Sequence, residues 1–182
     1  MGEAPTGFRR VLASDPARAI YAIPEQRTSM SAADDDLEYL SPADILAIHD
    51  LVVTSSAVTP PGVSAEGAIE YTVAYVRGEV GDGPHGIHET AYHLLRLLVA
   101  NHPFVDGNKR TALLSARTFY ALNGLDLEVD DRIRSILRDL ATDVASVDEP
   151  AVIAYLQDRT RPLPEDDHLS YAMWREHIDG RR

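Results

Sequence analysis

The segment from His102 to Thr111 reads HPFVDGNKRT and brings a histidine, a carboxylate and two cations together in the chain. His102 is suited to act as a general base, because an imidazole exchanges protons near neutral pH. Asp106 offers a carboxylate oxygen of the kind that Mg²⁺ prefers, and Lys109 and Arg110 carry positive charge suited to phosphate oxygens. A base, a metal ligand and phosphate-binding cations in one short string are typical of a phosphoryl- or nucleotidyl-transfer site.

The second half of this string is expected to lie at the N-terminus of a helix that runs from Asn108 to about Asn123. There the backbone N–H groups of Gly107, Asn108 and Lys109 would be free, and with the helix dipole they would form an anion site. Gly107 allows a tight turn and the approach of a phosphate without a Cβ in the way. We therefore predict that the phosphates of a nucleotide bind to a set of four residues: Gly107, Asn108, Lys109 and Arg110.

Each part of the string also has a purely structural interpretation. A His-Pro-Phe sequence can simply end a helix, because helices commonly stop before proline. Asp106 can be an N-cap for the next helix, and Lys109 and Arg110 can be solvated. Cations are nevertheless disfavoured at a helix N-terminus unless an anion offsets them. The occurrence of all these residues in one spaced string favours the functional interpretation.

Helical patterns account for most of the chain around this string. Ser41-Pro42-Ala43-Asp44 is typical of a helix start, with a serine N-cap, a proline in the first turn and an acid at the third position. The helix that ends at Asn101 is so apolar that it should lie centrally. No segment shows a convincing strand period, so we predict an all-α fold. The expected helices cover residues 42–56, 64–78, 87–100, 108–123, 131–145 and 149–160.

The segments between and beyond these helices define the expected domain organisation. Residues 57–63 contain consecutive prolines and a glycine, so they are predicted to form a loop or flap. Residues 1–38 lack a sustained apolar period and are predicted to be a flexible extension. Residues 161–182 are predicted to be a polar tail with one short helix near Trp174. The folded domain is therefore expected to span residues 39–160.

Composition excludes several classes of function. The net charge of −12 disfavours nucleic-acid binding, because the chain would repel a phosphate backbone at long range. The sequence has no apolar run long enough to span a membrane and no signal-like segment at its start, so neither a membrane partner nor secretion is expected. The absence of cysteine excludes disulfides and thiolate metal sites. These features together predict a cytoplasmic location.

A second group of possible metal ligands lies in the predicted central helix. His88-Glu89 followed by His93 is similar to a zinc-protease helix, but these histidines are five residues apart and should point to different sides. We therefore expect them to be solvated or hydrogen-bonded, without a metal.

The string from His102 resembles the signature of the Fic/Doc family. That signature has a histidine, a phenylalanine two residues later, an acidic residue, glycine or alanine, and then asparagine, lysine or glycine, and arginine. The resemblance extends over about 120 residues, and it includes the following shorter segments: Tyr39-Leu40-Ser41-Pro42, Ile48-His49-Asp50, Pro61-Gly62-Val63 and Asn123-Gly124.

The resemblance implies a compact helical bundle with the motif helix at its centre, and ATP and Mg²⁺ as cofactors. It assigns His102 as the base and Asp106 as the Mg²⁺ carboxylate. It also assigns Asn108 and Arg110 as phosphate contacts and Phe104 as the core anchor of the loop.

Two positions make the chain similar to the Doc type. Family members that transfer AMP usually have a second glycine where this chain has Lys109, and an arginine where it has Leu113. Doc-type members are thought to bind the nucleotide reversed, with the γ-phosphoryl group facing the histidine. Doc itself has alanine at the position of Gly107, so the similarity is to the wider Doc group.

The resemblance therefore implies a toxin-like protein kinase that phosphorylates a serine or threonine of a translation factor. AMP transfer to a protein hydroxyl is the alternative within the fold, and a catalytically silent binding module is the alternative without catalysis. The intact set of His102, Asp106, Asn108 and Arg110 argues against the silent module, because a binding module would not need a base.

The resemblance also bears on regulation. Self-inhibited Fic proteins carry a serine or threonine four residues before Glu-Gly or Glu-Asn. Here the residue four before Glu66-Gly67 is Gly62, so no self-inhibitory helix is expected. We expect a small antitoxin instead, with a disordered segment that folds onto the enzyme. The extension 1–38 is the alternative inhibitor within the chain.

Overall fold

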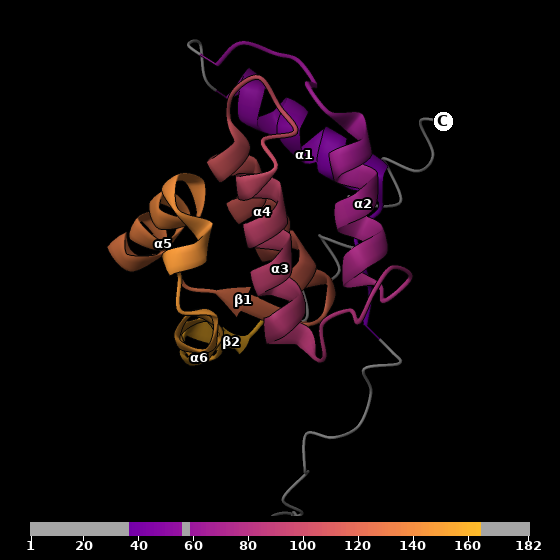
Figure 1. Cartoon of the computed structure of the whole chain (residues 1–182). Helices are drawn as coiled ribbons and strands as arrows, with labels where there is room; N and C mark the ends of the chain where they lie inside the picture. The colour runs from indigo at the N-terminus through magenta and orange to yellow at the C-terminus, as the bar shows by residue number, and fades with distance from the viewer. Residues whose placement is uncertain (1–36, 56–58, 165–182) are drawn as a thin grey trace, which may run out of the picture. The chain divides into compact units, whose positions relative to one another are not determined.

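The structure is a computed structural model that describes residues 37–55 and 59–164. This part of the chain is mostly helical, which confirms the predicted all-α class (Figure 1). The helices are α1 (Pro42–Thr54), α2 (Glu66–Val76), α3 (Ile87–Ala100), α4 (Asn108–Leu122), α5 (Asp131–Thr142), the short 3₁₀ helix η2 (Val144–Ser146) and α6 (Glu149–Arg159), and the strands are β1 (Leu125–Leu127) and β2 (Thr160–Pro162).

The predicted start of α1 is confirmed in detail. The Ser41 hydroxyl accepts a hydrogen bond from the backbone N–H of Asp44 at 3.2 Å, and the Asp44 carboxylate accepts one from the backbone N–H of Ser41 at 2.7 Å. This reciprocal pair satisfies two of the N–H groups that a helix start leaves open. The helix ends at Thr54, and residue 56, where it was expected to end, lies outside the described residues.

Helices α3 and α4 form the centre of the fold (Figure 1). Leu95 and Leu98 of α3 are fully buried, as the apolar composition of this helix predicted. On α4 the buried side chains include the small residues Ala112 and Ala116, which allow close helix packing. Helices α1 and α2 pack on one side of this pair, and α5 and α6 contact α3 on the other. The two ends of the loop 101–107 are thus positioned by the two central helices.

A small β-sheet is the feature that the sequence did not predict. Strands β1 and β2 pair antiparallel, with Leu125 opposite Pro162. Each strand has only three residues, too short for a period of two to be recognised. Gly124, with φ of 75°, ends α4 as predicted and leads directly into β1. The pair fastens the chain after α6 to the chain after α4.

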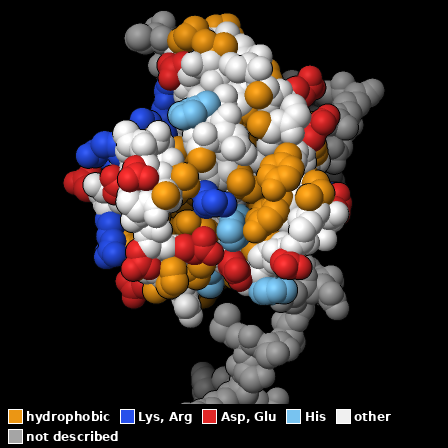
Figure 2. Space-filling view, in the orientation of Figure 1, with side chains coloured by type: hydrophobic (Ala, Val, Ile, Leu, Met, Phe, Trp, Pro, Cys, Tyr) orange, Lys and Arg blue, Asp and Glu red, His pale blue; other side chains and the backbone are white. Residues whose placement is uncertain are grey.

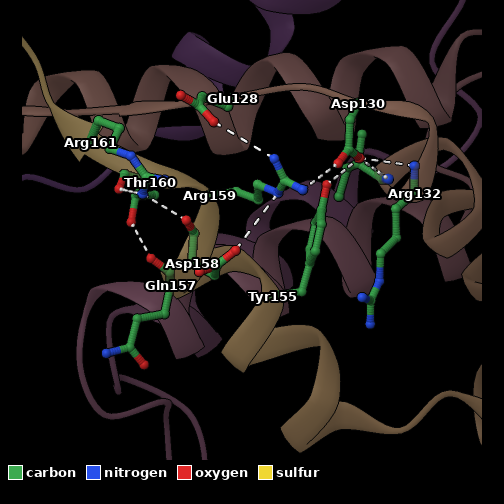
Figure 3. Close-up of polar contacts among 10 residues, drawn as sticks. Glu128, Asp130, Arg132, Tyr155, Gln157, Asp158, Arg159, Thr160 and Arg161 are labelled. Atoms are coloured by element: carbon green, nitrogen blue, oxygen red, sulfur yellow. Dashed lines mark hydrogen bonds and ion pairs between the residues drawn. The ribbon is translucent and has the colours of Figure 1, made fainter.

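A polar network lies where this sheet meets α5 and α6 (Figure 3). The guanidinium group of Arg159 lies between carboxylates, with Nη2 at 3.2 Å from Asp130 and Nη1 at 3.8 Å from Glu128. The Tyr155 hydroxyl donates a hydrogen bond to Asp130 at 2.6 Å, and Asp130 caps α5 through the backbone N–H of Arg132. The hydrogen bond from Tyr155 is the main cause of a lowered pKa at Asp130. One carboxylate therefore connects the start of α5 to α6.

Some predictions fall on parts of the chain that the structure does not describe. The extension is described only at Leu37 and Glu38, and the short helix near Trp174 lies outside the described residues. No helix among residues 37–55 and 59–164 is long and apolar enough to cross a membrane. On the face drawn in Figure 2, acidic side chains are interspersed with basic ones.

Candidate active site

The loop between α3 and α4 has unusual backbone geometry at both ends. His102 has φ of 44°, which a residue with a side chain rarely adopts, and Gly107 has φ of 79°. The His102 side chain is exposed and makes no hydrogen bond among the described residues. Strained positions of this kind often occur at functional sites. The side chain of the predicted base is therefore exposed to solvent, and its backbone has an uncommon conformation.

The N-terminus of α4 has no side-chain cap. Gly107 is the N-cap residue, and the backbone N–H groups of Asn108, Lys109 and Arg110 have no acceptor in the described part of the chain. The N–H of Gly107, which we expected to be free, instead donates to the carboxylate of Asp106 at 2.6 Å. Three adjacent N–H groups, aided by the helix dipole, form the kind of site that binds an anion. The N–H groups without an acceptor are therefore one residue further along the helix than we predicted.

Gly107 has a steric reason to be glycine in addition to its positive φ. A Cβ at this position would lie 3.2 Å from Cγ1 of Val52 and 3.6 Å from Cε1 of His49. Both neighbours belong to α1, so a larger residue would push α4 and α1 apart. The glycine thus keeps the start of α4 close to α1.

The side chain of Asn108 holds the loop closed. Its Oδ1 accepts a hydrogen bond from the backbone N–H of Phe104 at 2.9 Å, and its Nδ2 donates to the carbonyl of Phe104 at 2.8 Å. Because both ends of the amide are occupied, the predicted phosphate contact of Asn108 is left to its backbone N–H. Its side chain acts on the shape of the loop.

Asp106 and Arg110 lie side by side at the mouth of the anion site. Arg110 Nη2 is 3.9 Å from Asp106 Oδ2, and 48% and 53% of the respective side chains are exposed. The same guanidinium donates a hydrogen bond to the hydroxyl of Thr59, which is buried in the flap. An exposed pair at this distance is weakly held, so the Arg110 guanidinium can turn towards a ligand. Lys109 is exposed and forms no ion pair among the residues that the structure describes.

His49 is a part of the site that the prediction from residue chemistry missed. It is 3% exposed, its ring stacks on Phe104 with 3.7 Å between centroids, and its Nδ1 lies 3.0 Å from the hydroxyl of Thr111. Burial lowers the pKa of His49, so the ring is neutral at pH 7. The signal was present in the sequence, because His49 lies on the same helical face as Ile45 and Val52. This ring joins α1 to the loop and to the first turn of α4.

The flap lies along the motif loop. The predicted loop structure is confirmed for its described residues, which start at Thr59. Val63 forms an antiparallel bridge with Phe104, and the N–H of Val105 donates to the carbonyl of Gly62 at 3.0 Å. Gly62 has φ of 145°, and a Cβ there would lie 2.9 Å from Cγ2 of the Val105 side chain, so both the backbone conformation and the close approach of Val105 favour glycine. The flap is therefore held by backbone hydrogen bonds to the loop that carries the candidate residues.

The loop and the start of α4 bring together an exposed imidazole, a half-exposed carboxylate, and free N–H groups beside two cationic side chains. These are the groups that can accept a proton from a hydroxyl and hold phosphate groups during its attack. All of the residues predicted from the string that starts at His102 lie on the loop 101–107 or on the first turn of α4, and His49 supports them from α1.

The chain is similar to one protein family and to two named members of the Doc group. The model of the Fic/DOC family matches residues 39–120, which include the flap and the whole candidate site. Toxin Doc from Mycolicibacterium smegmatis is 32% identical over 117 residues, 63% of this chain and 88% of that protein. Protein kinase doc from Escherichia phage P1 is 28% identical over 116 residues, 63% of this chain and 91% of that protein.

Proposed function

Because the chain belongs to the Fic/DOC family, we propose that it is a toxin-like transferase that uses ATP at the loop between α3 and α4. Its reaction is the transfer of the γ-phosphoryl group to a serine or threonine hydroxyl of a protein, with a translation factor as the target class. The observation that carries this proposal is the uncapped start of α4 beside Asp106 and Arg110. The name of the phage relative, a protein kinase, supports the same reaction.

The anion site fits the phosphates of a nucleotide. The N–H groups of Asn108, Lys109 and Arg110 would receive phosphate oxygens, and the side chains of Lys109 and Arg110 would add positive charge. Arg110 would exchange its hydrogen bond to Thr59 for a phosphate oxygen. Because Thr59 belongs to the flap, nucleotide binding would then also change how the flap is held.

The donor chemistry at Asp106 fits Mg²⁺. Oδ1 accepts a hydrogen bond from the N–H of Gly107, which fixes the carboxylate, and Oδ2 faces Arg110 at 3.9 Å. A single carboxylate shared with phosphate oxygens is a common way to hold Mg²⁺. Bound there, the ion would offset the negative charge of the phosphates.

His102 would act as the general base. It would accept the proton of the target hydroxyl as the hydroxyl oxygen bonds to the γ-phosphorus and the bond from that phosphorus to the β–γ bridging oxygen breaks. ADP is then the leaving group, and the target carries a phosphate ester. The exposed position of His102 supports this role, because the hydroxyl belongs to another protein that must reach the site.

Lys109 and Leu113 support γ-phosphoryl transfer over AMP transfer. Lys109 is exposed at the first turn of α4, where its side chain occupies space that a second glycine would leave open. The side chain of Leu113 packs against the core, so this position supplies no cation to the loop. The attacked phosphorus must lie in line with the base, so these two residues decide the product through the orientation of the nucleotide.

An antitoxin is the proposed partner. The relative from Mycolicibacterium smegmatis is named a toxin, and a toxin without internal inhibition needs an inhibitor supplied by another chain. Among the described residues of the chain, no helix carries the inhibitory sequence.

Isotope transfer tests the reaction directly. The purified chain is incubated with Mg²⁺, a lysate of a sensitive host and ATP labelled with ³²P at either the γ- or the α-position. We expect the wild-type chain to add a labelled protein band with γ-³²P-ATP only, and this band should be absent with the His102→Ala chain and with the lysate alone. Label from α-³²P-ATP would replace the kinase proposal by AMP transfer, and absence of label from both positions would contradict both reactions.

A further inference from the structure

Three possible metal ligands meet at the opposite end of α3 from the candidate active site. Glu89 and His93 are one helical turn apart on α3, and Glu149 is the first residue of α6. One ligand atom from each residue lies within 4.8 Å of the others. The site joins two helices and shares no residue with the loop 101–107.

His93 distinguishes this cluster from a group of surface carboxylates, because its imidazole is buried. It is 5% exposed, and its Nδ1 is buried without a hydrogen-bond partner among the described residues. Its Nε2 faces Glu149 with 3.8 Å to Oε1, which is too long for a hydrogen bond. A buried polar atom without a partner is costly, so a buried imidazole with one unpaired nitrogen and the other facing a carboxylate at 3.8 Å indicates a missing ligand.

We propose that Glu89, His93 and Glu149 bind a divalent transition-metal ion, of which Zn²⁺ is the probe. One imidazole and two carboxylates are a donor set found in zinc sites, with ligand distances of about 2 Å. Ligand atoms around such an ion are roughly 3.3 Å apart for tetrahedral geometry. The three side chains therefore need only small rotations to close on the ion.

A neighbouring contact orients one of the two carboxylates. Glu89 Oε2 accepts a hydrogen bond from the backbone N–H of His85 at 2.9 Å. Burial, followed by the negative charge of Glu149, raises the pKa of the Tyr92 hydroxyl, so this group stays a neutral donor close to the other carboxylate. Partners of this kind commonly fix metal ligands in place. The positive charge of Arg96 lies close enough to His93 to oppose the ion, but the two carboxylates exceed it. The bound ion would hold α6 against α3.

The hydrogen bonding that we expected for these histidines is present at His88, whereas Nδ1 of His93 has no partner among the described residues. The His88 ring bonds instead to the hydroxyl of Tyr120, with 3.0 Å from Nδ1 to the oxygen. The ligand that completes the cluster is Glu149, which comes from another helix far along the chain. Spacing within one helix cannot show such a ligand.

Zn²⁺ binding to the full chain tests the proposal. The Asp106→Asn chain, without a histidine tag, serves as the reference, because it lacks the carboxylate proposed to hold Mg²⁺. Calorimetric titration with Zn²⁺ should show one ion per chain, and the same titration of Glu149→Gln in this background should show none. Glu70→Gln, which removes an exposed carboxylate of α2, is the matched control and should bind like the reference.

Thermal unfolding gives a second measurement. Zn²⁺ at about 100 times its dissociation constant should raise the Tm of the reference chain by roughly 5–10 °C. We expect no such rise for Glu149→Gln or for His93→Gln. Because 40% of the Glu149 side chain is exposed, the Glu149 variant should fold like the reference in circular dichroism without metal. No binding by the reference chain, or equal binding by the reference and Glu149→Gln, would overturn the proposal.

Discussion

His102 combines a strained backbone with an exposed side chain, and this combination leads to a specific prediction. His102→Ala should lower the transfer rate by about 10²–10⁴, the usual effect of losing a positioned base. The Tm should change little, because the side chain is exposed and makes no hydrogen bond with the described residues. Growth arrest in a sensitive host, compared at equal protein levels, is the measurement. Equal arrest by both chains would show that His102 is not the base.

His49 allows the structural support of the site to be measured separately. His49→Ala should lower the free energy of unfolding by about 2–4 kcal/mol, because it removes the ring stacked on Phe104 and the partner of Thr111. Asp50→Ala is the control, since its side chain is exposed on the same helix and should change this energy by less than about 0.5 kcal/mol. Urea unfolding of both variants is the measurement. Similar midpoints would mean that the stack contributes nothing.

At the scale of elements, the capping carboxylate Asp130 predicts a pH dependence of stability. Its pKa in the folded state is lowered from 3.8, mainly by the hydrogen bond from Tyr155. A lowered carboxyl pKa gives stability that is present above pH 3.8 and is lost as pH falls through the folded-state pKa. Tyr155→Phe should therefore be less stable than the wild type at pH 7, and the difference should shrink as the pH falls below 3.8.

The measurement is the urea midpoint of both chains between neutral pH and the acid range. Tyr71→Phe is the control, because Tyr71 is 46% exposed. A difference between Tyr155→Phe and wild type that is the same at all pH values would show that the hydrogen bond does not depend on the charge of Asp130.

Helix starts could be predicted because their causes are local. Ser41, Asp130 and Asp148 each cap a helix through N–H groups two or three residues away, so the signal and its partner lie in one short segment. The pairing of β1 with β2 was missed because strand partners come from distant segments. For the same reason the anion site was predicted from one string of residues, whereas the hydrogen bond of Asp106 to Gly107 depends on a backbone turn that residue types alone do not fix.

At the scale of the whole molecule, contacts between helices determine what the sequence could not show. The Thr59 hydroxyl reaches Arg110 from the flap, and Glu149 reaches His93 from α6. Both contacts depend on how the helices pack around α3 and α4, so neither is encoded in a local spacing. The prediction of the core was easier, because a very apolar helix has only one favourable place in a globular fold.

The last prediction concerns the partner that an active toxin requires. If the chain is a toxin, the wild type should be expressed stably only together with a small neighbouring gene whose product binds it. The His102→Ala chain should be expressed alone, because it lacks the base, and it should still bind that product, because the exposed side chain contributes little to the fold. Co-purification of the product with both chains, and growth of a sensitive host that makes each chain alone, are the measurements. Binding by both chains with arrest by the wild type alone would separate inhibition from folding. Harmless expression of the active wild type alone, in a host whose proteins it labels from ATP in a lysate, would contradict a toxin role.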